Sequence, residues 1–166
     1  MNLADLNALD EHVAAREFLR CCGSSRWAAR MVQARPFASA DEMSAAADTA
    51  WWALARPDWL EAFAAHPQIG SSAPVSAWSA MEQAGVAGAA ERTRLRLAEA
   101  NRDYQTRFGY IFIVCATGKS ADEMLELLEA RLRHDPDHEL RIAAEEQRKI
   151  TQLRLTKLLD TSADHP

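Results

Sequence analysis

The chain has 166 residues, of which 48% are hydrophobic and 26% are charged, and this length and composition suffice for one compact core. Its 19 Lys and Arg against 24 Asp and Glu give a net charge of −5. This acidic balance argues against nucleic acid and anionic membranes as partners, and the longest apolar run, residues 110–116, is far shorter than the ~20 residues that span a bilayer. Because the N-terminus lacks the features of a secretory leader and the three cysteines offer neither a disulfide framework nor a CxxC metal site, we expect a cytoplasmic protein.

The first half of the chain is predicted to be helical. Alanine is abundant, whereas glycine and proline are scarce, and this composition favours helix at most positions. The break at residues 23–25 (GSS) supplies a cap for a helix that closes at Arg35–Pro36. Ser39 with Glu42, and further along the chain Ser120 with Glu123, have the spacing of a capping box. The predicted helices span residues 3–9, residues 13–19, Ser24 to Arg35, Ser39 to about Ala55, and Arg56 to just before His66.

The second half continues the helical pattern with one exception, residues 108–116. Their β-branched and aromatic side chains favour extended chain, yet no other segment offers a partner strand for the backbone groups. We expect either an irregular segment threaded through a helical core or the start of a buried helix. The remaining predicted elements are a loop over residues 68–75, a helical turn or two through Trp78 and Met81 that ends at Gly85, and helices over 87–107, Ser120 to about His134, and Pro136 to about Asp160. Residues 1–166 are thus predicted to form a single all-α domain of about eight helices.

The sequence contains no Walker loop, GxGxxG, GxSxG or HExxH motif, so a catalytic site would have to rely on individual side chains. His66 is the first candidate. Pro67 follows it, which keeps His66 out of the α region and ends the preceding helix with a restricted backbone geometry. A neutral imidazole held in this way accepts or delivers a proton at physiological pH. The structural alternative is a histidine at a helix end, hydrogen-bonded to a nearby carbonyl.

Two further charged residues interrupt apolar stripes. Glu82 lies in an otherwise apolar helical pattern, where it either needs a partner or caps its own helix together with Ser79. Arg154 lies between Ile150 and Leu158 at helical spacing, so its guanidinium either snorkels outward or is buried against an anion. A buried Glu82 and a buried Arg154 would need each other or a ligand, because unpaired buried charges are very unfavourable.

Four segments occur in an order that resembles a known family: residues 62–70 (AFAAHPQIG), 78–85 (WSAMEQAG), 107–116 (RFGYIFIVCA) and 149–155 (KITQLRL). The sequence is similar in these motifs, and over nearly its whole length, to the 2-oxo-4-hydroxy-4-carboxy-5-ureidoimidazoline (OHCU) decarboxylases of uric acid breakdown. Gln68 and Met81 depart from the residues most frequent in that family.

The resemblance implies an all-helical homodimer without a cofactor that converts OHCU to (S)-allantoin and carbon dioxide. It also implies that His66, Glu82 and Arg154 are the catalytic residues and that no metal takes part. The substrate-binding positions implied by the resemblance are Pro67, Ser79, Ala80, Met81, Gln83, Phe112, Ile113, Val114, Cys115 and Ala116.

The chemistry of OHCU agrees with the absence of cofactor motifs. Its ring C5=N imine lies next to the carboxylated carbon and accepts the electrons that decarboxylation releases. We expect His66 to hydrogen-bond the C4 hydroxyl and to take its proton as the enol-like intermediate becomes a ketone. We also expect residues 112–116 to bind the urea-like substrate through backbone groups that no regular secondary structure pairs.

Two alternatives belong to other functional classes. One is a non-enzymatic helical interaction domain in which Glu82 and Arg154 form a structural ion pair. The other is a metal-dependent ureide amidohydrolase that uses His66, His134 and His138, although Asp135–Pro136 interrupts the spacing of the last two and favours solvated histidines.

Overall fold

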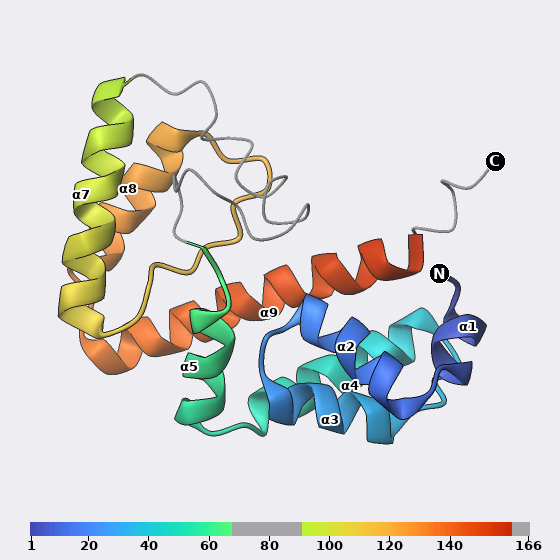
Figure 1. The fold of residues 1–166 in the computed structure, drawn as a ribbon. Helices are drawn as coiled ribbons and strands as arrows, with labels where there is room; N and C mark the ends of the chain where they lie inside the picture. The colour runs from blue at the N-terminus through green and yellow to red at the C-terminus, as the bar shows by residue number, and fades with distance from the viewer. Residues whose placement is uncertain (68–90, 161–166) are drawn as a thin grey trace. The chain divides into compact units, whose positions relative to one another are not determined.

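The computed structural model describes residues 1–67 and 91–160, which contain eight helices and no strand (Figure 1). This confirms the all-α prediction. The loop expected at residues 68–75 and the helical turns expected around Trp78 and Met81 lie outside the described residues. The helices are α1 (Leu3–Ala8), α2 (Glu11–Cys21), α3 (Ser25–Ala34), α4 (Ala40–Trp52), α5 (Arg56–Ala64), α7 (Glu91–Phe108), α8 (Ala121–Arg131) and α9 (Pro136–Asp160). They fall into two compact units, residues 1–62 with 148–166 and residues 63–147.

Side-chain caps begin α4 and α8 as predicted, but the two caps differ in detail. The Ser39 hydroxyl accepts the N–H of Glu42, whereas the Glu42 carboxylate accepts the N–H of Ala38 rather than that of Ser39. The capping box predicted at α4 is therefore only half formed. At α8 both halves are present, because Ser120 accepts the N–H of Glu123 and the Glu123 carboxylate accepts the N–H of Ser120.

The first unit is built around α2, α3 and α4, with α3 packed against both neighbours (Figure 1). Its core contains Phe18 and Trp27, whose rings meet edge to face with centroids 6.0 Å apart. The indole N–H of Trp27 donates to the carbonyl of Ala47 at 3.1 Å, which satisfies its polar atom inside the core. The second half of α9 joins this unit through Gln152, whose side chain binds Ser44 of α4.

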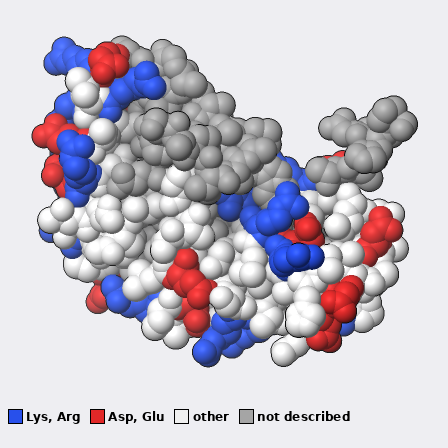
Figure 2. Space-filling view, viewed as in Figure 1, with Lys and Arg blue, Asp and Glu red and all other residues white. Residues whose placement is uncertain are grey.

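In the second unit, α7 and α8 lie side by side (Figure 1). Polar contacts cross between them at their exposed edges: Arg96 pairs with Glu129 at 2.7 Å, and the Thr93 hydroxyl donates to Asp122 at 3.0 Å. Figure 2 shows basic and acidic side chains interspersed over α7. On the face of α7 in this view, the charged residues therefore form a solvated surface of mixed sign.

An aromatic cluster forms the core of the second unit. The Tyr104 ring contacts Phe108 and Phe112, with centroid distances of 4.7 and 5.4 Å, and the Phe63 ring lies 5.2 Å from that of Tyr110. Four of these residues flank or belong to the segment that departed from the helical pattern. That segment is therefore anchored by its own aromatic side chains.

Residues 111–116 adopt neither helix nor strand, although most of their side chains are buried. The prediction of an irregular segment threaded through a helical core is confirmed, and the alternative of a buried helix is wrong. Two glycines with positive φ bracket the segment, Gly109 at +85° and Gly118 at +78°. Gly109 ends α7 by donating its N–H to the carbonyl of Gln105, in the left-handed conformation that glycine adopts without steric strain.

Within residues 1–67 and 91–160, no helix is both long and apolar enough to cross a membrane.

Candidate functional site

His66 lies two residues beyond the end of α5. Its backbone N–H donates to the carbonyl of Phe63 at 3.2 Å, and Pro67 follows, so the chain leaves the helix at this point as predicted. The half-buried imidazole places Nε2 2.6 Å from Oε1 of Gln147 on α9. The histidine thus contacts a side-chain amide oxygen 81 residues away in the sequence.

Gln147 is a site residue that sequence reasoning missed. It is fully buried, and the carboxylate of its neighbour Glu146 accepts the backbone N–H of Cys115 at 3.4 Å. One turn of α9 therefore contacts both His66 and the irregular segment. The sequence pattern that singled out Arg154 could also have found Gln147. Its amide interrupts a stripe of small and apolar residues, seven positions before Arg154 on the same face of the helix.

A buried ionic cluster holds the backbone of the irregular segment. The Arg131 guanidinium donates to the carbonyl of Ile113, lies 4.6 Å from the centre of the Phe112 ring, and donates from Nε to Glu139 at 2.7 Å. The Glu139 side chain is completely buried and also accepts the hydroxyl of Tyr104. The arginine thus fixes one carbonyl of the segment expected to bind substrate.

The electrostatics of this cluster favour a neutral tyrosine. Burial raises the pKa of the Tyr104 hydroxyl far above its usual range, more than the nearby Arg131 guanidinium lowers it. Tyr104 consequently remains a hydrogen-bond donor to Glu139 at any pH at which the protein functions. Lys119 adds a further contact at the end of the segment by donating from Nζ to the carbonyl of Cys115 at 2.9 Å.

Arg154 belongs to the first unit and is buried, with 8% of its surface exposed. Of the two predicted arrangements, outward snorkelling is therefore wrong. Its Nη1 lies 3.5 Å from the backbone carbonyl of Arg20, and its charge acts on the thiols of Cys21 and Cys22. A guanidinium is thus held inside the protein at the position that the family resemblance indicated.

The remaining predicted site residues divide into two groups. Pro67 and the segment 112–116 lie within the described residues, with Pro67 half-buried beside His66. The second group lies outside the described residues and consists of the predicted site residues of the second motif: Ser79, Ala80, Met81, Glu82 and Gln83.

The histidines invoked for a metal-dependent amidohydrolase have other partners. His134 places Nδ1 3.0 Å from the Glu139 carboxylate, and its ring packs edge to face against that of His138, with centroids 4.7 Å apart. No group of three or more His, Cys, Asp or Glu side chains suited to a metal ion occurs in the described parts of the chain. In the described residues, His66, His134 and His138 therefore do not form the metal site that the amidohydrolase alternative requires.

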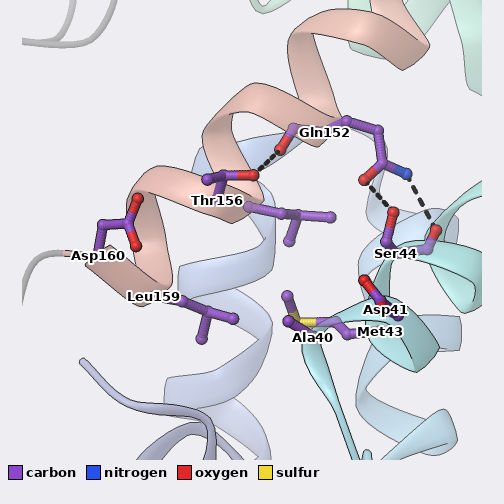
Figure 3. Close-up of a pocket in the computed structure, with 9 residues that line it drawn as sticks. Ala40, Asp41, Met43, Ser44, Gln152, Thr156, Leu159 and Asp160 are labelled. Atoms are coloured by element: carbon purple, nitrogen blue, oxygen red, sulfur yellow. Dashed lines mark hydrogen bonds between the residues drawn. The ribbon is translucent and has the colours of Figure 1, made fainter.

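A hollow of about 230 Å³ lies in the first unit between α4 and the end of α9 (Figure 3). The Gln152 side chain lies at its edge, with its oxygen 2.6 Å from the Ser44 hydroxyl and its nitrogen 2.7 Å from the Asp48 carboxylate. None of the predicted site residues lines this hollow, so we do not assign it to catalysis. Its lining residues are Ala40, Asp41, Met43, Ser44, Gln152, Leu155, Thr156, Leu159 and Asp160.

The two adjacent cysteines give a pH-dependent prediction. Burial raises the pKa of Cys22 from 9.0 to about 11 and that of Cys21 to about 12. The folded protein therefore keeps both thiols protonated at pH values where the unfolded chain has lost the protons. The free energy of unfolding should be highest below about pH 9 and should fall between pH 9 and 11, by up to roughly 1.4 kcal/mol per pH unit for each thiol.

Urea denaturation at pH 8, 9 and 10 measures this dependence, with the Cys22→Ala variant as the comparison. The variant should show a shallower loss of stability with pH, because it lacks one of the two thiols. Parallel curves for the two proteins would contradict the role given to Cys22.

Comparison with known proteins identifies the family. Residues 7–156 match the family model described as OHCU decarboxylase. The chain is 41% identical over 154 residues to the uric acid degradation bifunctional protein TTL of Arabidopsis thaliana, covering 89% of this chain but only 48% of that protein, so it spans about half of that relative. It is 29% identical over 163 residues to the OHCU decarboxylase of Haloferax volcanii, covering 95% of each chain.

Solved structures agree with this comparison. A crystal structure of OHCU decarboxylase in the presence of (S)-allantoin matches with a TM-score of 0.78 and 41% identity, over 86% of this chain and 96% of that chain. A crystal structure of (S)-allantoin synthase matches with a TM-score of 0.72, over 96% of this chain and 55% of that one; at 20% identity it shows a shared fold alone. The chain therefore belongs to the OHCU decarboxylase family, whose members are carboxy-lyases of uric acid degradation.

Proposed function

We propose that this chain, an OHCU decarboxylase whose product is (S)-allantoin, carries out the reaction with His66, Glu82 and Arg154 and without a cofactor. The observation that carries the proposal is the placement of His66 of the His-Pro motif, whose imidazole is fixed at the end of α5 by a 2.6 Å bond to a fully buried side chain. A general acid or base must be held in this way to meet its substrate productively. Assembly as a homodimer and a cytoplasmic location are parts of the same proposal.

Decarboxylation breaks the bond between C4 and the carboxylate carbon, and the bonding electrons move toward the ring C5=N imine. Carbon dioxide leaves, and the former imine nitrogen, which then carries the negative charge, takes up a proton. The resulting enol-like intermediate must lose the proton of its C4 hydroxyl and gain a proton at C5. We assign the hydroxyl proton to His66, since a neutral imidazole accepts a proton near neutral pH. Protonation of one face of C5 then sets the S configuration of allantoin.

Glu82 and Arg154 have roles that follow from their charge. Glu82 either binds the ureido and ring N–H groups, orients His66, or delivers the proton to C5. Arg154 is better used on a carbonyl or ureido oxygen where negative charge develops than on the departing carboxylate, because only interactions that strengthen in the transition state accelerate the reaction.

Residues 112–116 suit a urea-like substrate. Within the described residues, no helix or strand pairs the backbone groups of this segment. Side chains hold the carbonyls of Ile113 and Cys115 and the N–H of Cys115, which keeps the backbone in place, and we assign the ligand to other backbone groups of the segment. We propose that the segment binds the polar edge of OHCU. Pro67 and the positions from Ser79 to Gln83 complete the proposed binding surface.

The experiment that tests the proposed function is an assay of freshly generated OHCU, followed by circular dichroism to detect stereospecific (S)-allantoin. OHCU decays spontaneously, so a reaction without protein provides the reference rate. We expect optically active product at a rate well above that reference, and undiminished activity after exhaustive chelation. Racemic product at the spontaneous rate would overturn the proposal, and loss of activity on chelation would favour the metal-dependent alternative.

A further inference from the structure

We propose that Gln147 is a positioning residue for His66, which fixes the tautomer of the imidazole so that Nδ1 is the proton-accepting nitrogen. The proposal rests on the role given to His66 in the proposed function. It concerns a residue that none of the four family motifs contains.

The direction of the hydrogen bond sets the tautomer. Oε1 of Gln147 lies 2.6 Å from Nε2 of His66, and an amide oxygen only accepts hydrogen bonds. This contact is a hydrogen bond when Nε2 carries the proton. A neutral imidazole has a single N–H, so its lone pair is on Nδ1, and this is the nitrogen that takes the proton from the substrate hydroxyl.

The burial of Gln147 makes this restraint firm. Its side chain is fully buried on the long helix α9, so its oxygen has no bulk water to bind in place of His66. Breaking the bond, or turning the ring so that Nε2 loses its proton, would leave a buried acceptor without this donor. The ring is thus held in one orientation and in one protonation pattern.

An amide differs in its effect from a carboxylate at the same place. A carboxylate partner would favour the imidazolium form, in which no lone pair is left to act as a base. A neutral acceptor orients the ring without stabilising its positive charge to the same degree. This is the arrangement that a base acting on a hydroxyl requires at neutral pH.

The adjacent residue ties the same turn of α9 to the proposed binding segment, since the Glu146 carboxylate accepts the N–H of Cys115. Gln147 and Glu146 are consecutive, so the histidine and the segment are positioned from one rigid piece of helix. A shift of α9 would move both together. This coupling explains why a residue outside the recognised motifs contributes to the geometry of the reaction.

Two variants separate positioning from a merely structural role. Gln147→Leu has a similar size but no acceptor, whereas Gln147→Glu keeps an oxygen acceptor at the same place. We expect Gln147→Leu to lower kcat about 10- to 100-fold with little change in KM, because misplacing a reacting group by about 1 Å slows a reaction by up to about 100-fold. Gln147→Glu keeps the acceptor but favours the imidazolium, so it should recover most of that loss only at a pH high enough to leave the imidazole neutral, with the pH profile of kcat displaced to higher pH. Gln33→Leu, on the exposed surface of α3, is the matched control and should retain full activity.

Nitrogen-15 NMR of protein labelled at its histidines reports the tautomer directly. The His66→Gln variant identifies the His66 signals among the five histidines. Wild type and Gln147→Glu should show a protonated Nε2, and Gln147→Leu should show a mixture of tautomers. Thermal melts of each variant establish that it is folded.

The outcomes distinguish this inference from the proposed function. If Gln147→Leu keeps the wild-type kcat, or loses activity with an unchanged tautomer, the positioning role is wrong even though His66 is catalytic. If His66→Gln itself retains full activity, the role of His66 in the proposed function is wrong, whatever tautomer the NMR spectra show.

Discussion

Replacing His66 by glutamine is expected to lower kcat for OHCU by roughly 100- to 10,000-fold, the usual contribution of a general acid or base. Glutamine is the informative substitution because its side-chain N–H reaches the place of Nε2 and still donates to Oε1 of Gln147, which is 2.6 Å from Nε2 in the native protein. The variant therefore removes the nitrogen that accepts the proton while it keeps the buried contact satisfied. Its thermal melt should remain close to that of the wild type.

The measurement compares kcat from the OHCU assay with the midpoint of thermal unfolding for each protein. His12→Gln is the matched control, because His12 lies on the exposed surface of α2 and belongs to no proposed site. We expect this control to retain full activity. A folded His66→Gln protein with wild-type kcat would remove the histidine from the reaction.

The second large effect is expected at the buried pair of Arg131 and Glu139. Replacement of Glu139 by leucine should lower the free energy of unfolding by about 3–5 kcal/mol, because it leaves the Arg131 guanidinium buried without its counter-charge. The pair is deeply enclosed, with 6% of the Arg131 side chain exposed and none of the Glu139 side chain. The Tyr104 hydroxyl also loses its acceptor in this variant.

A double-mutant cycle tests this interpretation. Arg131→Met together with Glu139→Leu should be less destabilised than the sum of the two single variants, since an apolar pair needs no counter-charge. Urea denaturation supplies the free energies of unfolding of the wild type, the two single variants and the double variant. Arg96→Met is the control, because the Arg96–Glu129 pair is exposed to solvent and should contribute little. Additive single effects would show that the charges of Arg131 and Glu139 do not depend on each other.

The pair also links stability to function. Arg131 donates to the carbonyl of Ile113, so the variants that remove it release one fixed point of the irregular segment. We expect Arg131→Met to raise KM for OHCU in addition to lowering stability, when activity is measured at a temperature where the protein is folded.

The sequence by itself determined the elements whose causes are local. Helix caps such as Ser24 and Ser120, the alanine-rich composition and the spacing of apolar residues act within a few positions of one another, and the eight helices of the described residues follow them closely. The exit of the chain at His66–Pro67 is also local, because proline restricts the residue before it. The family motifs indicate the same histidine, because its imidazole can accept or deliver a proton near neutral pH.

Only the tertiary structure decided the partners of these residues. Gln147 contacts His66 across 81 positions of the sequence. No local pattern marks Arg131 and Glu139 as a pair, and they meet only where α8 and α9 pack around the irregular segment. Residues 111–116 similarly had the composition of a strand but take an irregular course, because the described chain supplies them with aromatic and ionic contacts instead of a neighbouring strand. Hydrogen bonding and burial depend on which groups the whole fold brings within about 3 Å, and no local pattern contains that information.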